Sequence, residues 1–214
     1  MDCCSTIRGL NSVFDERTAR AEVKRYWKKG LDRHARRIVT ALVARGVAGA
    51  SLLEVGAGIG GLHAELLQQG AARATDVDVS AAYLAAAQSV AERLGLRERV
   101  EFRHADFAGA ADDLPVADVV IMHRVVCCYP DMPTLVGAAA RHADRLLALS
   151  YPRDAWYTRL GQRILNAVLW LQRSEFRFYV HDAAAIQAAA AAAGLALVRQ
   201  VNSWPWQVAL FERA

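Results

Sequence analysis

The segment from Leu52 to Leu62 constrains the fold of this chain more than any other. It opens with Leu52-Leu53-Glu54-Val55 and then passes through glycines at positions 56, 58, 60 and 61. Leucines at 62, 66 and 67 follow at helical spacing, so the segment predicts a buried strand, a glycine-rich loop and a helix. Because glycine has no Cβ, such a loop brings backbone N–H groups close to a ligand, and it is typical of sites for nucleotide-like cofactors.

Strand and helix patterns alternate along the rest of the chain, which predicts an α/β fold with a doubly wound, Rossmann-like sheet of seven strands. The last two strands are joined by four residues and form an antiparallel hairpin, and ligands are expected at the carboxyl ends of the parallel strands. The expected strands are 52–55, 74–79, 100–103, 117–122, 145–150, 196–202 and 207–212. The expected helices are 15–29, 31–46, 60–69, 80–94, one opening at 130–131, 154–173 and 182–194. Asp15 and Ser80 are expected to cap the first and fourth of these, and Asp131 and Asp182 mark the starts of two others.

These elements divide the chain into a helical preface, residues 1–48, and a main domain, residues 49–214, with a helical insertion at about 154–180. The amphipathic helix 154–173 is expected to pack as core or as a lid over an acceptor pocket. Peripheral contact of this helix with a membrane is a further alternative. The aromatic residues in and after it predict an apolar or aromatic acceptor: Trp156, Tyr157, Phe176, Phe178 and Tyr179.

Composition narrows the class of protein further. Hydrophobic residues make up 54% of the 214 and charged residues 22%, which is typical of a globular chain. No run reaches the roughly 18 apolar residues of a membrane span, and no apolar signal segment opens the chain, so a cytoplasmic location is expected. Residues 1–50 carry 11 Lys or Arg against 5 Asp or Glu. A solvated helix face explains this excess better than binding of an acidic partner or nucleic acid.

Four cysteines occur as two adjacent pairs, Cys3-Cys4 and Cys127-Cys128. Neither pair has the C-x-x-C spacing of zinc or thioredoxin sites, so no metal site is predicted. The second pair is expected to behave as small hydrophobic residues, with a reactive thiol as the alternative.

The glycine loop alone also fits the fingerprint of dinucleotide-binding enzymes, Gly56-x-Gly58-x-x-Gly61. Asp78 lies 22 residues beyond Gly56, near the spacing at which an acid meets a ribose. Asp76 points to the same face and competes, but Asp78 is favoured because it is nearer the strand tip and the Ser80 cap. Three details favour another cofactor: Glu54 just before the first glycine, a helical segment of about 50 residues ahead of the first strand, and the closing hairpin.

With these residues the chain, over 50–212, resembles the class I S-adenosylmethionine-dependent methyltransferases. The resemblance implies that 53–60 is the cofactor loop, that Asp78 holds the ribose hydroxyls, that Asp106 meets the adenine amine, and that 123–130 borders the methyl donor and the acceptor. The cofactor-binding residues implied or expected are Glu54, Gly56, Ala57, Gly58, Gly60, Asp78, Val79, Asp106, Phe107 and His123, with Tyr26 and Gly30 of the preface closing over the methionine end.

A fainter similarity links the chain to the magnesium-protoporphyrin O-methyltransferases. It rests on the helical preface and on Cys127-Cys128-Tyr129-Pro130, where those enzymes show His-Tyr-Pro. The histidine of that motif is Cys128 here, so the similarity does not carry their substrate over to this chain.

The function that follows is methyl transfer to an oxygen or nitrogen atom of a small acceptor. Such an acceptor loses a proton, and His123 at the end of the fourth strand is the first candidate base, with Tyr129 the second; satisfaction of a backbone group is the alternative role for His123. A nucleic-acid methyltransferase is a weaker alternative, because no Asn/Asp-Pro-Pro-Tyr type of motif follows the fourth strand. A fold member with altered or no activity is the third. The sequence predicts no oligomeric state.

Overall fold

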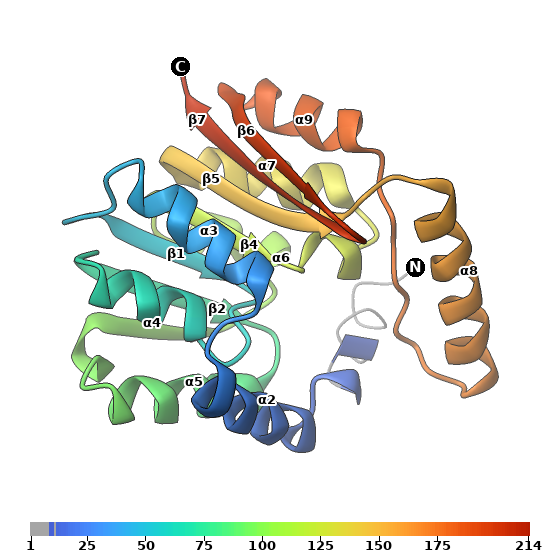
Figure 1. The fold of residues 1–214 in the computed structure, drawn as a ribbon, viewed down its shortest axis with the longest axis horizontal. Helices are drawn as coiled ribbons and strands as arrows, with labels where there is room; N and C mark the ends of the chain where they lie inside the picture. Colours follow the sequence, from blue (N-terminus) through green and yellow to red (C-terminus); the bar gives the residue numbers. More distant parts are fainter. Residues whose placement is uncertain (1–8, 11) are drawn as a thin grey trace.

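The computed structural model describes residues 9, 10 and 12–214, and its centre is a seven-stranded sheet of order β3-β2-β1-β4-β5-β7-β6 (Figure 1). All neighbouring strands are parallel except β7, which is antiparallel to both β5 and β6. The predicted fold, closing hairpin included, is therefore confirmed. The strands are β1 (Ser51–Val55), β2 (Arg73–Asp78), β3 (Val100–His104), β4 (Ala117–His123), β5 (Ala143–Pro152), β6 (Leu195–Ser203) and β7 (Trp206–Arg213).

Helices cover both faces of this sheet. One core joins the sheet to α2 (Glu16–Lys29), α3 (Arg33–Val43), α4 (Gly61–Gln68) and α5 (Ala81–Arg93). The opposite core joins it to α6 (Phe107–Ala110), α7 (Met132–His142) and α9 (Ala183–Ala192). Short 3-10 turns lie at η1 (Arg97–Arg99), η2 (Ala111–Asp113) and η3 (Val126–Cys128). The remaining helix, α8 (Trp156–Leu171), belongs to neither core.

The sequence explains why the strands stay in the middle of these layers. Leu52 and Leu53 are adjacent on β1, and because side chains alternate along a strand they enter opposite cores. Val119 and Val120 on β4 divide in the same way, opposite Leu52 and Leu53 in the parallel register. A strand that is apolar on both faces requires cover on both, which is the usual state of parallel sheets.

Polar caps fix where several helices begin, as predicted. The side chain of Asp15 accepts a hydrogen bond from the N–H of Thr18 at 2.8 Å, and Asp182 accepts from Ala184 at 2.8 Å. Ser80 and Asp131 cap α5 and α7 in the same manner. Each cap satisfies a backbone donor that has no partner inside its helix, and so sets the direction in which the chain leaves the preceding strand or loop.

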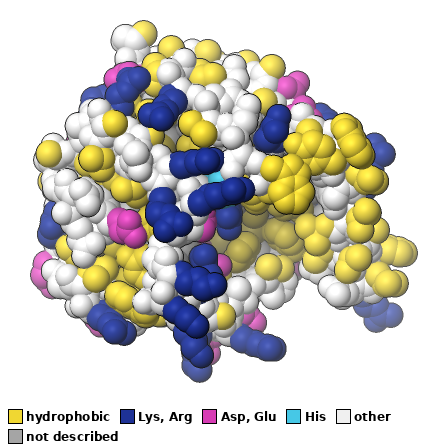
Figure 2. Space-filling model, viewed as in Figure 1, with side chains coloured by type: hydrophobic (Ala, Val, Ile, Leu, Met, Phe, Trp, Pro, Cys, Tyr) yellow, Lys and Arg dark blue, Asp and Glu magenta, His cyan; other side chains and the backbone are white. Residues whose placement is uncertain are grey.

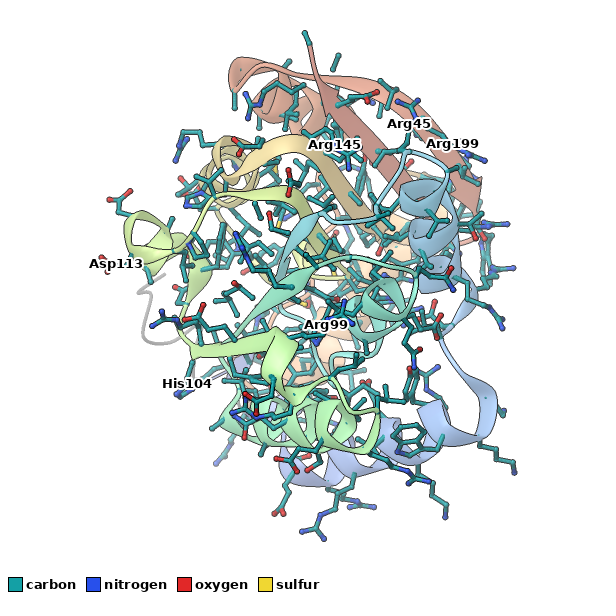
Figure 3. All side chains as sticks on the ribbon, turned by 90° about the vertical axis from the view of Figure 1, so that its left-hand side faces the viewer. Arg45, Arg99, His104, Asp113, Arg145 and Arg199 are labelled. Atoms are coloured by element: carbon teal, nitrogen blue, oxygen red, sulfur yellow. The ribbon has the colours of Figure 1, made fainter. Side chains whose placement is uncertain are left out.

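The helical preface packs onto the main sheet. Ile38 and Leu42 of α3 are fully buried in the first core. Arg145 of β5 donates hydrogen bonds of 2.7 Å to the carbonyls of Arg45 and Gly46, and Arg45 pairs with Glu212 of β7; Figure 3 shows Arg45 and Arg145 at the same end of the sheet. These contacts fix the preface against the strands, so its residues can take part in a site at the sheet edge.

The structure corrects the expectation that helix 154–173 packs as core or lid. In Figure 1, α8 stands apart from the sheet, and Thr158 is its only buried residue. Its large apolar side chains are exposed, because its polar side is turned inward: Asn166 binds the backbone of Phe178 through both its amide nitrogen, 2.8 Å, and its amide oxygen, 2.9 Å.

Cys3 and Cys4 lie outside the described residues. Within the part of the chain that the structure describes, none of the helices has the length and apolar character needed to cross a bilayer.

Candidate functional site

A cavity of about 380 Å³ lies at the carboxyl ends of the parallel strands, as expected from the topology. Residues from the glycine loop, the ends of β2 and β4, the connection between α2 and α3, and the segment after α8 line it. Figure 2 shows Lys and Arg side chains gathered beside a hollow with hydrophobic walls on this side of the molecule. The cavity therefore combines an apolar interior with a charged rim.

The glycine loop lines the cavity, and its glycines adopt backbone conformations that other residues rarely take. Gly56 and Gly58 have φ angles of 61° and 60°. A Cβ at position 56 would stand 2.6 Å from a methyl group of Val125. Glycine at 56 thus lets the loop after β1 touch the loop after β4. Gly60, predicted to bind cofactor, does not line the cavity; it precedes α4 with φ of 71°, and a Cβ there would meet the His63 ring.

Beneath this loop lies a buried polar cluster. One carboxylate oxygen of Glu54 accepts hydrogen bonds from the backbone N–H of His63, 3.0 Å, and is 2.9 Å from its Nδ1. Burial by itself lowers the pKa of His63, but the hydrogen bond and charge of Glu54 outweigh it and raise that pKa. Glu54 is among the residues that line the cavity, but its carboxylate is hydrogen-bonded to His63. It therefore fixes the start of α4 beneath the loop.

Asp76 and Asp78 have different surroundings although they share a face of β2. Asp76 is fully buried behind the cavity, and neither carboxylate oxygen has a hydrogen-bond partner among the described residues. Burial raises the pKa of Asp76 well above its ordinary value, which favours the neutral form of this carboxyl. Asp78 lines the cavity and accepts from the N–H groups of Ser80, 2.8 Å, and Gly58, 3.1 Å. Burial raises the pKa of Asp78, although these bonds oppose the shift.

Asp106 and Phe107 follow β3 and line the same cavity. Asp106 begins α6 and accepts a hydrogen bond from the N–H of Ala108 at 3.3 Å. The hydroxyl of Tyr129, on the loop after β4, is 3.5 Å from the other carboxylate oxygen. The nearby His104 does not line the cavity; its Nε2 is 2.9 Å from the carbonyl of Val79, and Figure 3 shows it at the outer strand.

His123 lies at the cavity with both ring nitrogens engaged. Its Nε2 is 3.1 Å from a carboxylate oxygen of Asp32, and its Nδ1 is 2.7 Å from the hydroxyl of the fully buried Ser150. Asp32 comes from the connection between α2 and α3, where it also caps α3 through the N–H groups of His34 and Ala35. The preface therefore contributes a carboxylate to the histidine at the end of β4.

Arg124 completes this polar group. Its guanidinium is 3.4 Å from the Asp32 carboxylate and stacks 5.0 Å from the centre of the Trp206 ring. Its backbone has φ of 62° and its N–H donates to the carbonyl of Ser150 at 3.1 Å. Burial by itself would raise the pKa of Asp32, but the hydrogen bond and charge of His123 and the charge of Arg124 hold it well below its usual range. Asp32 therefore remains a carboxylate.

Cys127 and Cys128 lie on the same loop, with their sulfur atoms 3.7 Å apart. Burial raises the pKa of the Cys127 thiol, and this thiol donates to the carbonyl of Arg124 at 3.3 Å. A protonated, hydrogen-bonded thiol is a poor nucleophile, which supports the prediction of small hydrophobic side chains. Across the described residues, no three His, Cys, Asp or Glu side chains converge as a metal site.

Some of the other residues singled out from the sequence line this cavity and some do not. Tyr26 and Gly30 line it, as do Ala57 and Val79. Phe176 and Phe178 line it too, but Trp156, Tyr157 and Tyr179 do not, and α8 contributes no residue to its wall. The expected contribution of this helix to a pocket is therefore not found at this cavity. His181 lies behind the loop, its Nε2 3.0 Å from the carbonyl of Tyr129.

Sequence reasoning missed Asp32, Arg124 and Trp206. The signal for Asp32 was present, because a helix-capping acid follows Gly30 at the junction of two helices. Its pairing with a histidine 91 residues away was not readable from local pattern. Arg124 adjoins the predicted histidine, and Trp206 begins the last strand.

Strand order, the reversed last strand, the glycine loop and the acids after β2 and β3 together define the class I methyltransferase fold. The chain belongs to a family of methyltransferase domains, whose model matches residues 25–200. This assignment confirms the predicted enzyme class, an S-adenosylmethionine-dependent methyltransferase. No curated protein sequence matches the chain significantly.

Solved structures agree with this assignment. The magnesium protoporphyrin IX methyltransferase of Synechocystis PCC 6803, crystallised with bound SAH, is 25% identical, with a TM-score of 0.69 over 84% of this chain and 81% of that chain. An O-methyltransferase family protein from Burkholderia thailandensis is 19% identical, with a TM-score of 0.73 over 96% and 63%. An O-methyltransferase family 2 protein from Planctomyces limnophilus, in complex with apigenin, is 20% identical, with a TM-score of 0.62 over 87% and 63%. The last two show likeness of fold alone.

The glycine loop yields a first prediction. In Gly56→Ala, the new Cβ meets Val125 and the residue must hold a left-handed φ, so the loop shifts away from the cavity. We expect the affinity for S-adenosylhomocysteine, measured by calorimetry, to fall by about tenfold or more. Gly46→Ala is the matched control, because φ there is 75° and nothing lies within 4 Å of the new Cβ. It should lose about 1–2 kcal/mol of stability and keep its affinity; equal affinities in both variants would contradict the prediction.

Asp76 yields a second prediction. As the pH rises above 3.8, its unfolded-state value, the unfolded chain ionises while the folded carboxyl stays neutral, so the free energy of unfolding falls by up to about 1.4 kcal/mol per pH unit. Asp76→Asn removes this titration. In urea denaturation at several pH values between about 5 and 7, the free energy of unfolding of the variant should increase relative to that of wild type as the pH rises.

The exposed residue Asp112 supplies the control for this titration. Asp112→Asn makes the same chemical change at an exposed position and shows the effect of the substitution itself. A difference between Asp76→Asn and wild type that stays constant over this pH range would show that Asp76 ionises equally in both states.

Proposed function

We propose that the protein transfers the methyl group of S-adenosylmethionine to an oxygen or nitrogen atom of a small apolar or aromatic acceptor. The observation that carries this proposal is the shape of one cavity. It extends from the glycine loop and Asp78 to the group formed by His123, Asp32 and Arg124, with aromatic walls from Phe178 and its neighbours. One cavity can therefore hold donor and acceptor together.

The donor end is assigned as follows. The loop from Gly56 to Gly58 provides backbone close to the cofactor, Asp78 holds the ribose hydroxyls and Asp106 meets the adenine amine. Tyr26 and Gly30 close over the methionine end. When bound, the cofactor supplies a methyl group that is already electrophilic at its sulfonium, so the main work of these residues is to orient it and to exclude water.

At the acceptor end, His123 is the candidate base. In the resting arrangement Nε2–H donates to the Asp32 carboxylate, and the Ser150 hydroxyl, which accepts from the N–H of Arg124, can donate to Nδ1. For His123 to act as the base, the proton must lie on Nδ1, with Ser150 accepting from it, and an acceptor hydroxyl or amine must replace Asp32 at Nε2, which then takes the proton of the acceptor. The imidazolium formed is then stabilised by Asp32, which stays ionised. Tyr129, at the same wall, is the second candidate.

The acceptor is expected to be apolar with a polar reacting atom. Phe178 packs edge-on against Trp206, with ring centres 6.3 Å apart, and Phe176 is part of the same wall. Arg124 is held over Trp206 at the rim, where it can attract an electron-rich acceptor. A nucleic-acid acceptor and a protein without turnover are the competing functions, and the cytoplasmic location stays a prediction of the sequence.

Cofactor choice is tested by calorimetry on the purified chain. We expect S-adenosylmethionine and S-adenosylhomocysteine to bind with one site, and NADH to leave no measurable heat, because the cavity wall beyond the glycine loop and Asp78 is lined largely by aromatic side chains and by the Asp32 carboxylate. Binding of NADH alone would overturn the assignment of the donor end.

The base is tested with methyl-labelled cofactor against a panel of phenols, carboxylic acids and amines, and against RNA. His123→Gln should lower kcat for the preferred acceptor by about 10²–10⁴-fold, with cofactor affinity unchanged, because only proton removal is lost. Asp32→Asn should lower kcat by a smaller factor and shift the pH dependence of kcat. The control Asp112→Asn should match wild type. Label appearing only in RNA, or equal kcat in the His123 variant, would overturn the proposal.

A further inference from the structure

The outward face of α8 is the largest feature of the molecule that methyl transfer does not explain. Among the described residues, seven of the thirteen large hydrophobic side chains that are exposed belong to this one helix: Trp156, Leu160, Ile164, Leu165, Val168, Trp170 and Leu171. Trp156, Trp170 and Leu171 are 77%, 68% and 76% exposed. In Figure 2, hydrophobic side chains gather on this side of the molecule, at the right of the view. Such a patch on a soluble chain marks a contact surface.

The rotation of α8 fixes this face outward. Thr158, Gln162 and Asn166 recur every four residues and form one ridge, which is directed toward the protein. Asn166 holds the backbone of Phe178 through two hydrogen bonds, and Thr158 is buried. Most of the exposed apolar residues lie on the opposite side of the helix, so turning them toward the rest of the chain would require breaking the Asn166 contacts.

Charge distinguishes among possible occupants of this face. Residues 155–174 contain Arg159, Arg163 and Arg173 and no acid. Asp154, just before the helix, pairs with Arg159 at 2.9 Å, which leaves the segment with a net positive charge. Helices with arginine beside a broad apolar face and with tryptophan at their ends are suited to the boundary of an anionic bilayer, where rings lie at headgroup level.

We propose that α8 docks in the plane of an anionic lipid bilayer, with its apolar arc below the headgroups and its arginines among the phosphates. The helix has 16 residues, about 24 Å of length, so it lies along the surface rather than crossing it. A bilayer also accepts a convex ridge without a complementary groove, whereas a protein partner would need one.

Docking by α8 would orient the catalytic cavity. Phe176 and Phe178 follow the helix directly and line the cavity, and Asn166 ties the two segments together. The cavity is thereby held close to the bilayer surface, where apolar compounds are concentrated. This consequence rests on the proposed function, but bilayer binding itself does not, and it is measured without cofactor or acceptor.

The test is flotation of the full chain with vesicles of phosphatidylcholine alone and of an equal mixture of phosphatidylcholine and phosphatidylglycerol. Wild type should float with the mixed vesicles, and less with the neutral ones. The double variant Trp156→Glu, Trp170→Glu should lower the partition coefficient by about tenfold or more. Replacing Arg163 and Arg173 with Gln should lower binding to the mixed vesicles by about fivefold for each arginine, with binding to neutral vesicles unchanged.

Trp204→Glu is the matched control, because Trp204 is 69% exposed but lies on the closing hairpin. It should float as wild type does, and circular dichroism should give all variants the same melting transition. Absence of binding to both vesicle types would overturn the proposal. So would a dimer in light scattering that the double tryptophan variant dissociates while vesicles bind neither protein, since the occupant would then be a second copy of the chain.

Discussion

The contact between the loop after β1 and the loop after β4 is the constraint on which the site depends. Gly56 takes a left-handed φ and has no Cβ, and Val125 fills the space that a Cβ would need. The two loops can therefore form adjacent walls of one cavity, with Asp78 near one and His123 near the other. A bulkier residue at 56 would separate the wall near Asp78 from the wall near His123, although every strand could remain in place.

The Asp32–His123 contact gives the helical preface a part in this site. Other residues before β1 cover the first core, and Tyr26 and Gly30 line the cavity. Instead, the turn between α2 and α3 carries a carboxylate to the end of β4, where Arg124 and His123 both approach it. Two positive or protonatable partners keep Asp32 ionised despite partial burial. The preface and the sheet are thus electrostatically linked at the cavity.

Much of the fold was predictable because its signals are local. Alternating apolar runs located the strands, and single polar residues such as Asp15 and Ser80 located helix starts. The position of Asp78 at the strand tip favoured it over Asp76, and the structure places only Asp78 at the cavity. Long-range pairings were not predictable: His63 meets Glu54 by folding back across the glycine loop, and Asp32 meets His123 only once the sheet exists.

The direction of α8 shows the limit of periodicity most clearly. An amphipathic pattern indicates that one side of a helix is apolar, but it does not predict whether that side faces the core or the outside of the protein. In most globular proteins the apolar side faces the core; here the polar ridge of Thr158 and Asn166 faces the protein and the apolar arc faces out. Asn166 makes this arrangement specific, because its amide satisfies both the N–H and the C=O of Phe178. The rotation of α8 is therefore built into the chain, and its exposed arc is a surface directed toward something outside it.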